Sequence, residues 1–145
     1  MYNAAAEPEI GDIANCLIKM GAKIEGIGTS ELRIQGVEKL HGTEHNVIAD
    51  RIEAGSFLIA AGITGGKIEI ENLQPEILGA TLPKLKTAGI KIEEKENSII
   101  AKGNGIIATD INTEPFPGFA TDMQAQFMAL MCLAKGTSTI TETIF

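Results

Sequence analysis

Residues 8–36 read PEIGDIANCLIKMGAKIEGIGTSELRIQG, and residues 75–103 read PEILGATLPKLKTAGIKIEEKENSIIAKG. Both stretches open with Pro-Glu-Ile and continue through a helix-like segment to a glycine, Gly21 or Gly89. Each then has a lysine-flanked strand, a polar turn, a second strand and a closing glycine. Because such a repeat indicates a fold assembled from similar supersecondary pieces, we predict that both stretches fold as copies of one helix-and-hairpin element.

The repeat continues beyond these two stretches. Residues 50–72, DRIEAGSFLIAAGITGGKIEIEN, align with residues 120–142, ATDMQAQFMALMCLAKGTSTITE, so that Phe57 matches Phe127. One unit is therefore about 70 residues long, and the chain holds two such units.

Local patterns place helices and strands within the units. Pro8 suits the first turn of a helix that Gly21 ends, and TSEL, residues 29–32, predicts a hairpin turn. In the second copy, Pro83 is expected either to kink the helix or to mark a helix start near Leu82. Apolar residues of the first helix recur at the spacing of one helix face: Ile10, Ile13, Ala14, Leu17 and Ile18.

Two further helix starts carry the spacing of a capping box, Asp50 with Glu53 and Thr121 with Gln124. The helices that follow, SFLIAAGI and FMALMCLA, are apolar on nearly every side, which predicts central helices covered all round. KIEIE and TSTITETIF alternate like half-exposed strands. The expected fold class is α/β, with central helices and mixed sheet outside them.

The composition and net charge of the chain argue against several classes of protein. Apolar residues make up 44% of the chain and charged residues 21%, which excludes disorder. The net charge is -7, no basic cluster occurs and Trp is absent, so we expect no nucleic-acid partner. No apolar run approaches the roughly 18 residues of a membrane span, and the N-terminus lacks the features of a signal peptide. We therefore expect a cytoplasmic protein without a membrane partner.

Asp122 is the leading candidate for chemistry. It follows the predicted cap Thr121 in the first turn of an apolar helix, where free N–H groups and the helix dipole favour an ionised carboxylate. Such a carboxylate can accept the proton of a substrate hydroxyl. A structural role for Asp122 in the cap stays open. The preceding loop, residues 114–120 (EPFPGFA), is either part of a site or a simple connection.

Other polar residues are weaker candidates for a functional site. Asp50, Arg51 and Glu53 occupy the matching helix start of the first unit and either touch a ligand or only cap the helix. Glu7 and Glu9 begin the first helix, where acids are expected for dipole reasons, with ligand binding as the alternative.

Histidine and cysteine provide no further site. His41 and His45 lie near Glu44 without a third metal ligand, which predicts solvated loop histidines and no metal. Cys16 and Cys132 are expected to be small buried hydrophobes rather than nucleophiles.

Three segments of the chain resemble one known family. They are NAAAEPEIGDIANCLIKMGAKIEG (3–26), IADRIEAGSFLIAAGITGGKI (48–68) and PFPGFATDMQAQFMALMCLAKGTSTITETIF (115–145). These are similar to the UDP-N-acetylglucosamine 1-carboxyvinyltransferase branch of the enolpyruvyl transferases. The resemblance implies an inside-out α/β barrel of repeated units in two lobes. Residues 1–49 would belong to the lobe with the reactive loop, and residues 50–145 to the second lobe.

The resemblance also implies a reaction. The enolpyruvyl group of phosphoenolpyruvate passes to the 3-hydroxyl of UDP-N-acetylglucosamine and phosphate is released, without metal or cofactor. This is the first committed step of peptidoglycan synthesis, and so of cell-wall biogenesis, cell shape and cell division. Asp122 matches the family's carboxylate that binds the 3-hydroxyl and is proposed to take its proton, and Ile144 matches the position whose backbone contacts the nucleotide sugar. Further substrate-site positions implied are Thr121, Phe145, Asp50, Arg51, Glu53 and Glu7.

The sequence also departs from the family pattern. No counterpart of the family's reactive cysteine loop or of its basic phosphoenolpyruvate clamp is present, and Ala120 stands where many members have proline. We therefore expect a partial chain, inactive alone, that can self-associate through exposed apolar faces. The alternatives are a non-catalytic nucleotide-sugar-binding or assembly module, and 5-enolpyruvylshikimate-3-phosphate synthase, which lacks the TDMQAQ and TETIF sequences.

Overall fold

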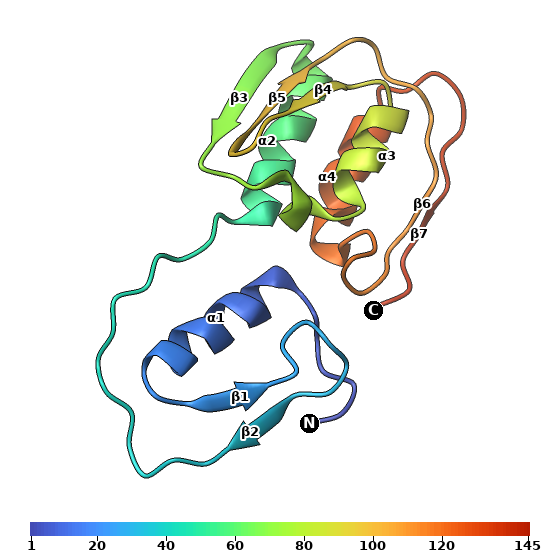
Figure 1. Ribbon diagram of the computed structural model, residues 1–145. Coiled ribbons are helices and arrows are strands. Elements are labelled where there is room, and N and C mark those ends of the chain that lie inside the picture. Colours follow the sequence, from blue (N-terminus) through green and yellow to red (C-terminus); the bar gives the residue numbers. More distant parts are fainter. The chain divides into compact units, whose positions relative to one another are not determined.

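The structure, a computed structural model, describes residues 1–145 in two compact units, Met1–Ile48 and Ala49–Phe145 (Figure 1). Each unit has its own secondary structure. The assignment of residues 1–49 and 50–145 to two different lobes stays a prediction. No helix is both long enough and apolar enough to cross a membrane.

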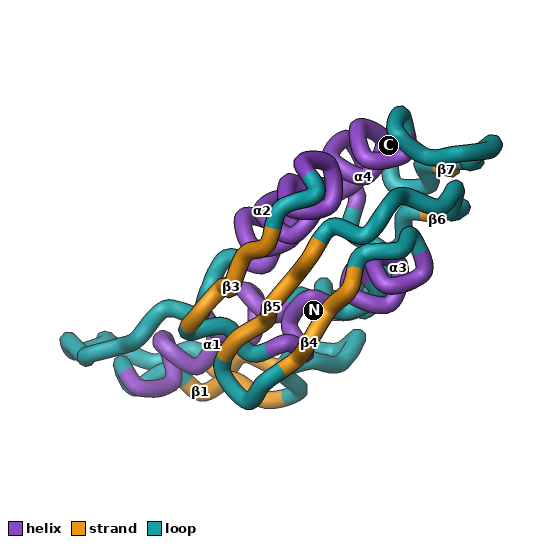
Figure 2. The backbone as a smooth tube through the Cα atoms, turned by 90° about the horizontal axis from the view of Figure 1, so that it is seen from above, coloured by secondary structure: helices purple, strands orange, loops and turns teal.

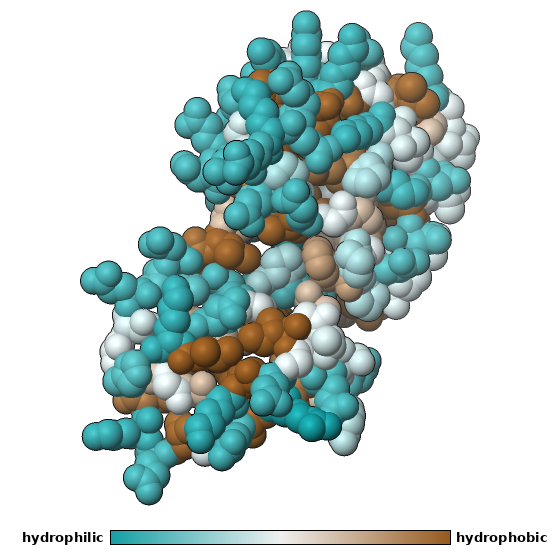
Figure 3. Space-filling view, in the orientation of Figure 1, coloured by the Kyte–Doolittle hydropathy of each residue, from teal (hydrophilic) through white to brown (hydrophobic).

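The first unit is one helix and one hairpin. Helix α1 (Pro8–Lys19) starts with its proline, and Gly21 follows it with a φ of +101°, as the sequence predicts. Strands β1 (Lys23–Glu25) and β2 (Arg33–Gln35) pair antiparallel, which confirms the hairpin. Of the predicted apolar helix face only Ala14 is buried, and hydrophobic side chains reach the surface of this unit (Figure 3).

The second unit holds the larger core. Its helices are α2 (Arg51–Thr64), α3 (Thr81–Thr87) and α4 (Gln124–Met131), with 3-10 turns η1 (Pro75–Leu78) and η2 (Thr121–Met123). Its strands are β3 (Lys67–Glu71), β4 (Lys91–Glu94), β5 (Ser98–Lys102), β6 (Ile111–Asn112) and β7 (Ile140–Thr141).

A three-stranded antiparallel sheet, in the order β3-β5-β4, forms one layer of this unit (Figure 2). Ile70 faces Ile99 across the first strand pair, and Ile68 faces Ala101. These residues point to the core, while the alternate lysines and glutamates of β3 and β4 stay exposed. The sheet therefore has one apolar face, which α2 and α3 pack against, and the predicted KIEIE strand is confirmed.

Helix α2 packs against both α3 and α4. The approach is close at Gly62, where a Cβ would lie 2.5 Å from Cδ1 of Ile90. On α4, Phe127 is fully buried and meets the Phe119 ring edge-on at 5.3 Å. Phe57 of α2 is 51% exposed, however, so the prediction that these helices are covered on all sides is wrong within this chain. Each helix buries one apolar face and leaves part of another at the surface.

The second helix-and-hairpin copy starts differently from the first. Its helix-like stretch forms two elements, η1 and α3, which are separated by Gly79 with a φ of +50°. Pro83 lies in the first turn of α3, which begins at Thr81, so the predicted helix start near Leu82 is confirmed. A proline is tolerated there because the first N–H groups of a helix have no intrahelical acceptor.

Strands β6 and β7 pair in parallel, with Ile111 opposite Ile140. The two strands run together at one side of the unit (Figure 1). In the segment TSTITETIF, exposed and half-buried residues alternate from residue 137 to residue 143, as predicted. Only Ile140–Thr141 of this segment is a β-strand.

Candidate active site

A single carboxylate just after β7 collects hydrogen bonds from three segments. The Thr113 hydroxyl donates to Oε1 of Glu142 at 2.7 Å, and the Thr121 hydroxyl donates to Oε2 at 2.7 Å. The backbone N–H of Ile144 also donates to Oε1, at 2.7 Å. We call these four residues the Glu142 cluster. It joins the end of β6, the turn η2 and the segment after β7.

The hydrogen bonds of the cluster favour the charged carboxylate. The Thr113 hydroxyl is the largest cause, followed by the Ile144 N–H, and together with the other donors they lower the pKa of Glu142 from 4.5 to about 2. Glu142 is therefore ionised at neutral pH, and its bonds to these donors are charge-assisted.

Asp122 is presented to solvent beside this cluster. It lies between Thr121, whose hydroxyl is bonded to Glu142, and Met123, which is buried. The Asp122 side chain itself is exposed. No side chain caps η2, so the predicted cap by Thr121 is wrong, because its hydroxyl donates to a carboxylate instead of accepting an N–H. The alternative role of Asp122 in a cap gains no support.

The loop before η2 is tightly turned. Glu114 donates its N–H to the carbonyl of Phe119 at 2.9 Å, and the Phe116–Pro117 peptide bond is cis. A Cβ at Gly118 would lie 2.4 Å from Cβ of Glu114, so glycine is needed for this close approach. The guanidinium carbon of Arg51 lies 5.8 Å from the centre of the Phe116 ring. The start of α2 therefore reaches the loop that leads to Asp122.

The start of α2 is capped as predicted. The Asp50 carboxylate accepts the N–H groups of Ile52 at 2.8 Å and Glu53 at 3.0 Å. Farther along α2, the Ser56 hydroxyl accepts a hydrogen bond from the Gln126 amide at 3.1 Å, which ties α2 to α4. The structure thus supports the structural role of Asp50. Ligand contacts of Asp50, Arg51 and Glu53 stay predictions.

The chain is similar over its whole length to proteins of one known family. The model of the EPSP synthase (3-phosphoshikimate 1-carboxyvinyltransferase) family matches residues 1–145. The chain belongs to this family. It is 57% identical to a UDP-N-acetylglucosamine 1-carboxyvinyltransferase of Granulibacter bethesdensis and 56% identical to one of Geotalea daltonii. Each alignment covers 100% of this chain and 35% of the relative, so the chain spans about a third of their length. The predicted family resemblance is confirmed.

A solved structure supports the fold. The enolpyruvyl transferase NikO from Streptomyces tendae superposes with a TM-score of 0.78 over 97% of this chain and 34% of its own, at 22% identity. The predicted α/β enolpyruvyl transferase architecture is therefore confirmed.

The first unit contributes one predicted site residue of this family, Glu7. It stands at the start of α1 without capping it, and its Oε2 is buried without a hydrogen-bond partner. A buried carboxylate oxygen in that state is costly unless something pairs with it. Its substrate contact stays a prediction.

Two predictions outside the candidate site are wrong. His45 is not a solvated loop histidine: its Nε2 lies 2.9 Å from Oδ1 of Asp12, and the two side chains are 12% and 13% exposed. Cys132 is exposed rather than buried, because α4 ends at Met131 and the apolar run continues past the covered part of the helix. Cys16 is half-buried.

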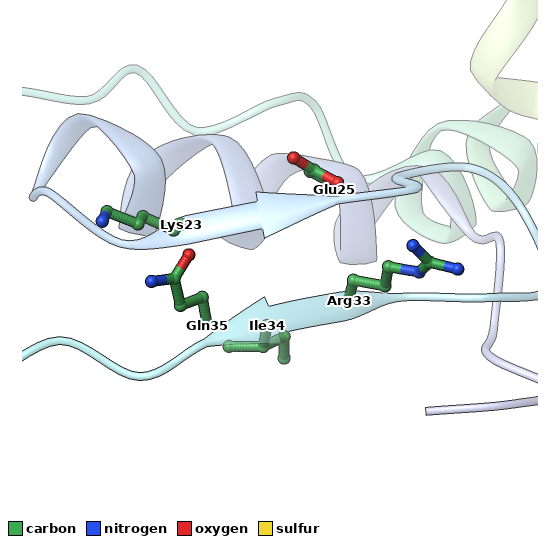
Figure 4. Close-up of a pocket in the computed structure, with 5 residues that line it drawn as sticks. All are labelled: Lys23, Glu25, Arg33, Ile34 and Gln35. Atoms are coloured by element: carbon green, nitrogen blue, oxygen red, sulfur yellow. The ribbon is translucent and has the colours of Figure 1, made fainter.

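A surface depression on the hairpin of the first unit contains none of the predicted site residues (Figure 4). Across the hairpin, Lys23 lies opposite Gln35 and Glu25 lies opposite Arg33, and Ile34 completes the lining. The Arg33 side chain is bonded to Glu31 at 3.1 Å. The depression is a surface feature of a two-stranded hairpin.

The residues that organise the site, Glu142 and Thr113, were missed in the sequence. A usable signal is present in TSTITETIF. Glu142 lies two residues after Ile140 and therefore on the same, inward-facing side of the extended segment. A carboxylate at such a position needs hydrogen-bond donors.

Proposed function

We propose that the full-length protein with this chain transfers the enolpyruvyl group of phosphoenolpyruvate to the 3-hydroxyl of UDP-N-acetylglucosamine in the cytoplasm. Phosphate is released, and the product enters peptidoglycan synthesis. The names of relatives more than 50% identical support the choice of this reaction. The exposed Asp122, fixed between the Thr121–Glu142 bond and buried Met123, carries the proposal.

Asp122 is proposed as the proton acceptor. Its carboxylate takes the proton of the sugar 3-hydroxyl as that oxygen bonds to C2 of phosphoenolpyruvate and a proton adds to C3. Loss of phosphate and of a C3 proton from the tetrahedral intermediate restores the double bond. A carboxylate suits this step because its oxygens accept a proton and can be held at hydrogen-bond distance from the hydroxyl.

The remaining residues are proposed to bind substrate. Glu142 already engages the N–H of Ile144, so a backbone contact from Ile144 to the nucleotide sugar would use its carbonyl oxygen. Arg51 lies over Phe116 in the loop before Asp122, which places a cation on the same side of the unit as this turn. Thr121, Phe145, Asp50, Glu53 and Glu7 complete the proposed substrate-binding set.

The test is turnover by a full-length enolpyruvyl transferase with residues 1–145 of this chain, hereafter the assay enzyme. Asp122→Asn keeps the size of the side chain and removes its basicity, so phosphate release should fall about 10²-fold or more. Glu76→Gln, at an exposed glutamate of η1, is the matched control and should leave the rate unchanged. A near-normal rate for Asp122→Asn would remove Asp122 from the chemistry.

A further inference from the structure

The proposed reaction uses Asp122 and Ile144 but gives no task to Glu142. Glu142 nevertheless bonds to the residue before Asp122 and to Ile144 itself. Its two oxygens are bound to different segments: Oε2 to the turn η2, and Oε1 to the segment after β7 and to Thr113. No other carboxylate of the second unit joins three segments in this way.

We propose that Glu142 is the positioning residue that fixes Asp122 relative to the backbone of Ile144, and so sets the sugar hydroxyl against its proton acceptor. The inference rests on the proposed function. It concerns how the site is held together, and Glu142 itself touches no substrate.

The first supporting observation is the rigidity of the anchor. Thr113 is completely buried, and its hydroxyl accepts the N–H of Thr143 at 2.8 Å while it donates to Glu142. The N–H of Thr113 donates to the carbonyl of Thr141 at 2.9 Å. The carboxylate is therefore held against the β6–β7 ladder and cannot move freely with the turn.

The second observation is the short connection to the reacting groups. Thr121 is covalently adjacent to Asp122, and the N–H bonded to Glu142 belongs to Ile144, whose carbonyl is proposed to contact the nucleotide sugar. One rigid carboxylate group thus spans both. A displacement of about 1 Å at a reacting group can cost about 10²-fold in rate, so a fixed connection of this kind matters for catalysis.

The third observation is charge. The threonine hydroxyls and the backbone N–H groups donate to an ionised carboxylate, and such bonds are stronger and shorter than bonds between neutral groups. Glutamine at this position keeps the length of the side chain but replaces one acceptor oxygen with an NH₂ donor. It therefore cannot accept all three hydrogen bonds at once.

The experiment is steady-state kinetics of Glu142→Gln in the assay enzyme. We expect kcat to fall about 10-fold or more and KM for UDP-N-acetylglucosamine to rise several-fold, because both Asp122 and Ile144 lose their fixed geometry. The matched control is Glu69→Gln. Glu69 accepts hydrogen bonds from Lys95 at 2.8 Å and Ser98 at 3.0 Å on the sheet, and its loss should leave both constants unchanged.

A second pair of variants keeps the test valid if Glu142→Gln fails to fold. Thr121→Val removes the hydroxyl donor and should reproduce the loss of kcat, whereas Thr121→Ser retains the donor and should lose less of it. The double variant Thr121→Val with Glu142→Gln should be no slower than the slower single variant, since both break the same contact.

Two results would overturn the inference. One is unchanged kcat and KM for Glu142→Gln or Thr121→Val at a temperature where the variant is folded, even if its melting temperature falls. The other is multiplication of the two single effects in the double variant. Asp122→Asn, measured in parallel, distinguishes failure of the proposed proton acceptor from failure of the positioning role. If Asp122→Asn keeps its rate, Asp122 is not the proton acceptor of the proposed reaction; if it loses activity while Glu142→Gln does not, only the positioning role fails.

Discussion

The starts of α2 and α4 occupy matching places in the two repeat units, but their polar groups are used differently. At α2, the Asp50 carboxylate accepts two N–H groups of its own helix. At η2 and α4, the Thr121 hydroxyl donates away from the helix to Glu142. Asp122 stays exposed there. One copy thus uses its polar residues for local stability, and the other uses them to hold a turn that presents a carboxylate.

The aromatic residues of the two helices differ in the same way. Phe127 is fully buried against Phe119, whereas its repeat counterpart Phe57 is half-exposed. The copy with the candidate site therefore also has the more completely packed aromatic core. A duplicated sequence pattern does not imply duplicated burial, because the neighbours of each copy differ.

The largest expected effect tests this difference in burial. Phe127→Ala should lower the free energy of unfolding by about 3–5 kcal/mol, because it removes a buried ring and leaves a cavity. Phe57→Ala should cost about 1 kcal/mol or less, since much of its ring is in water. Urea unfolding of the 145-residue chain measures both. Equal losses would mean that the two helices are equally buried.

A smaller effect is expected at the capped helix start. Asp50→Ala should lower the free energy of unfolding by about 1 kcal/mol, because two N–H groups at the start of α2 lose their acceptor. Asp50→Asn keeps a capping oxygen and should retain most of that stability. The same urea titration checks both variants, and an equally large loss for the asparagine variant would argue against the cap.

The smallest effect is a change in pH dependence at the second helix start. The pKa of Glu142 is lowered from 4.5 to about 2, so its contribution to stability is fully present above pH 4.5 and is lost as the pH falls towards 2. Glu142→Gln should flatten the stability profile in this window. Glu76→Gln serves as the control, and a carboxyl NMR titration of Glu142 gives its pKa directly. A midpoint near 4.5 would mean that the cluster does not form.

Much of the fold could be predicted from the sequence because its signals are local. Pro8 and Gly21 delimit α1, Asp50 caps α2, and the alternation in KIEIE places β3 on a half-buried sheet. In the second copy, Pro83 indicates the helix start near Leu82, but the separate turn η1 before Gly79 was not predicted, because a glycine with positive φ within an apolar stretch resembles a tolerated helical residue.

The candidate site was only partly predictable. Asp122 was found from its place at a helix start, but the use of Thr121 depends on Glu142, which arrives from β7, distant in the sequence. A capping box read from spacing alone cannot exclude such a competing acceptor. Cys132 and His45 were misjudged for a related reason: burial is decided by which segments cover a residue, and local composition does not record that.

The parallel pairing of Ile111 with Ile140 has a consequence for the order of folding. This contact closes a stretch of chain that includes η2 and α4, and it can form only after β7, the last strand of the unit, has been synthesised. During synthesis, β7 leaves the ribosome after every other strand of this unit has emerged. The nascent chain can therefore build its sheet and helices well before Asp122 acquires its final orientation.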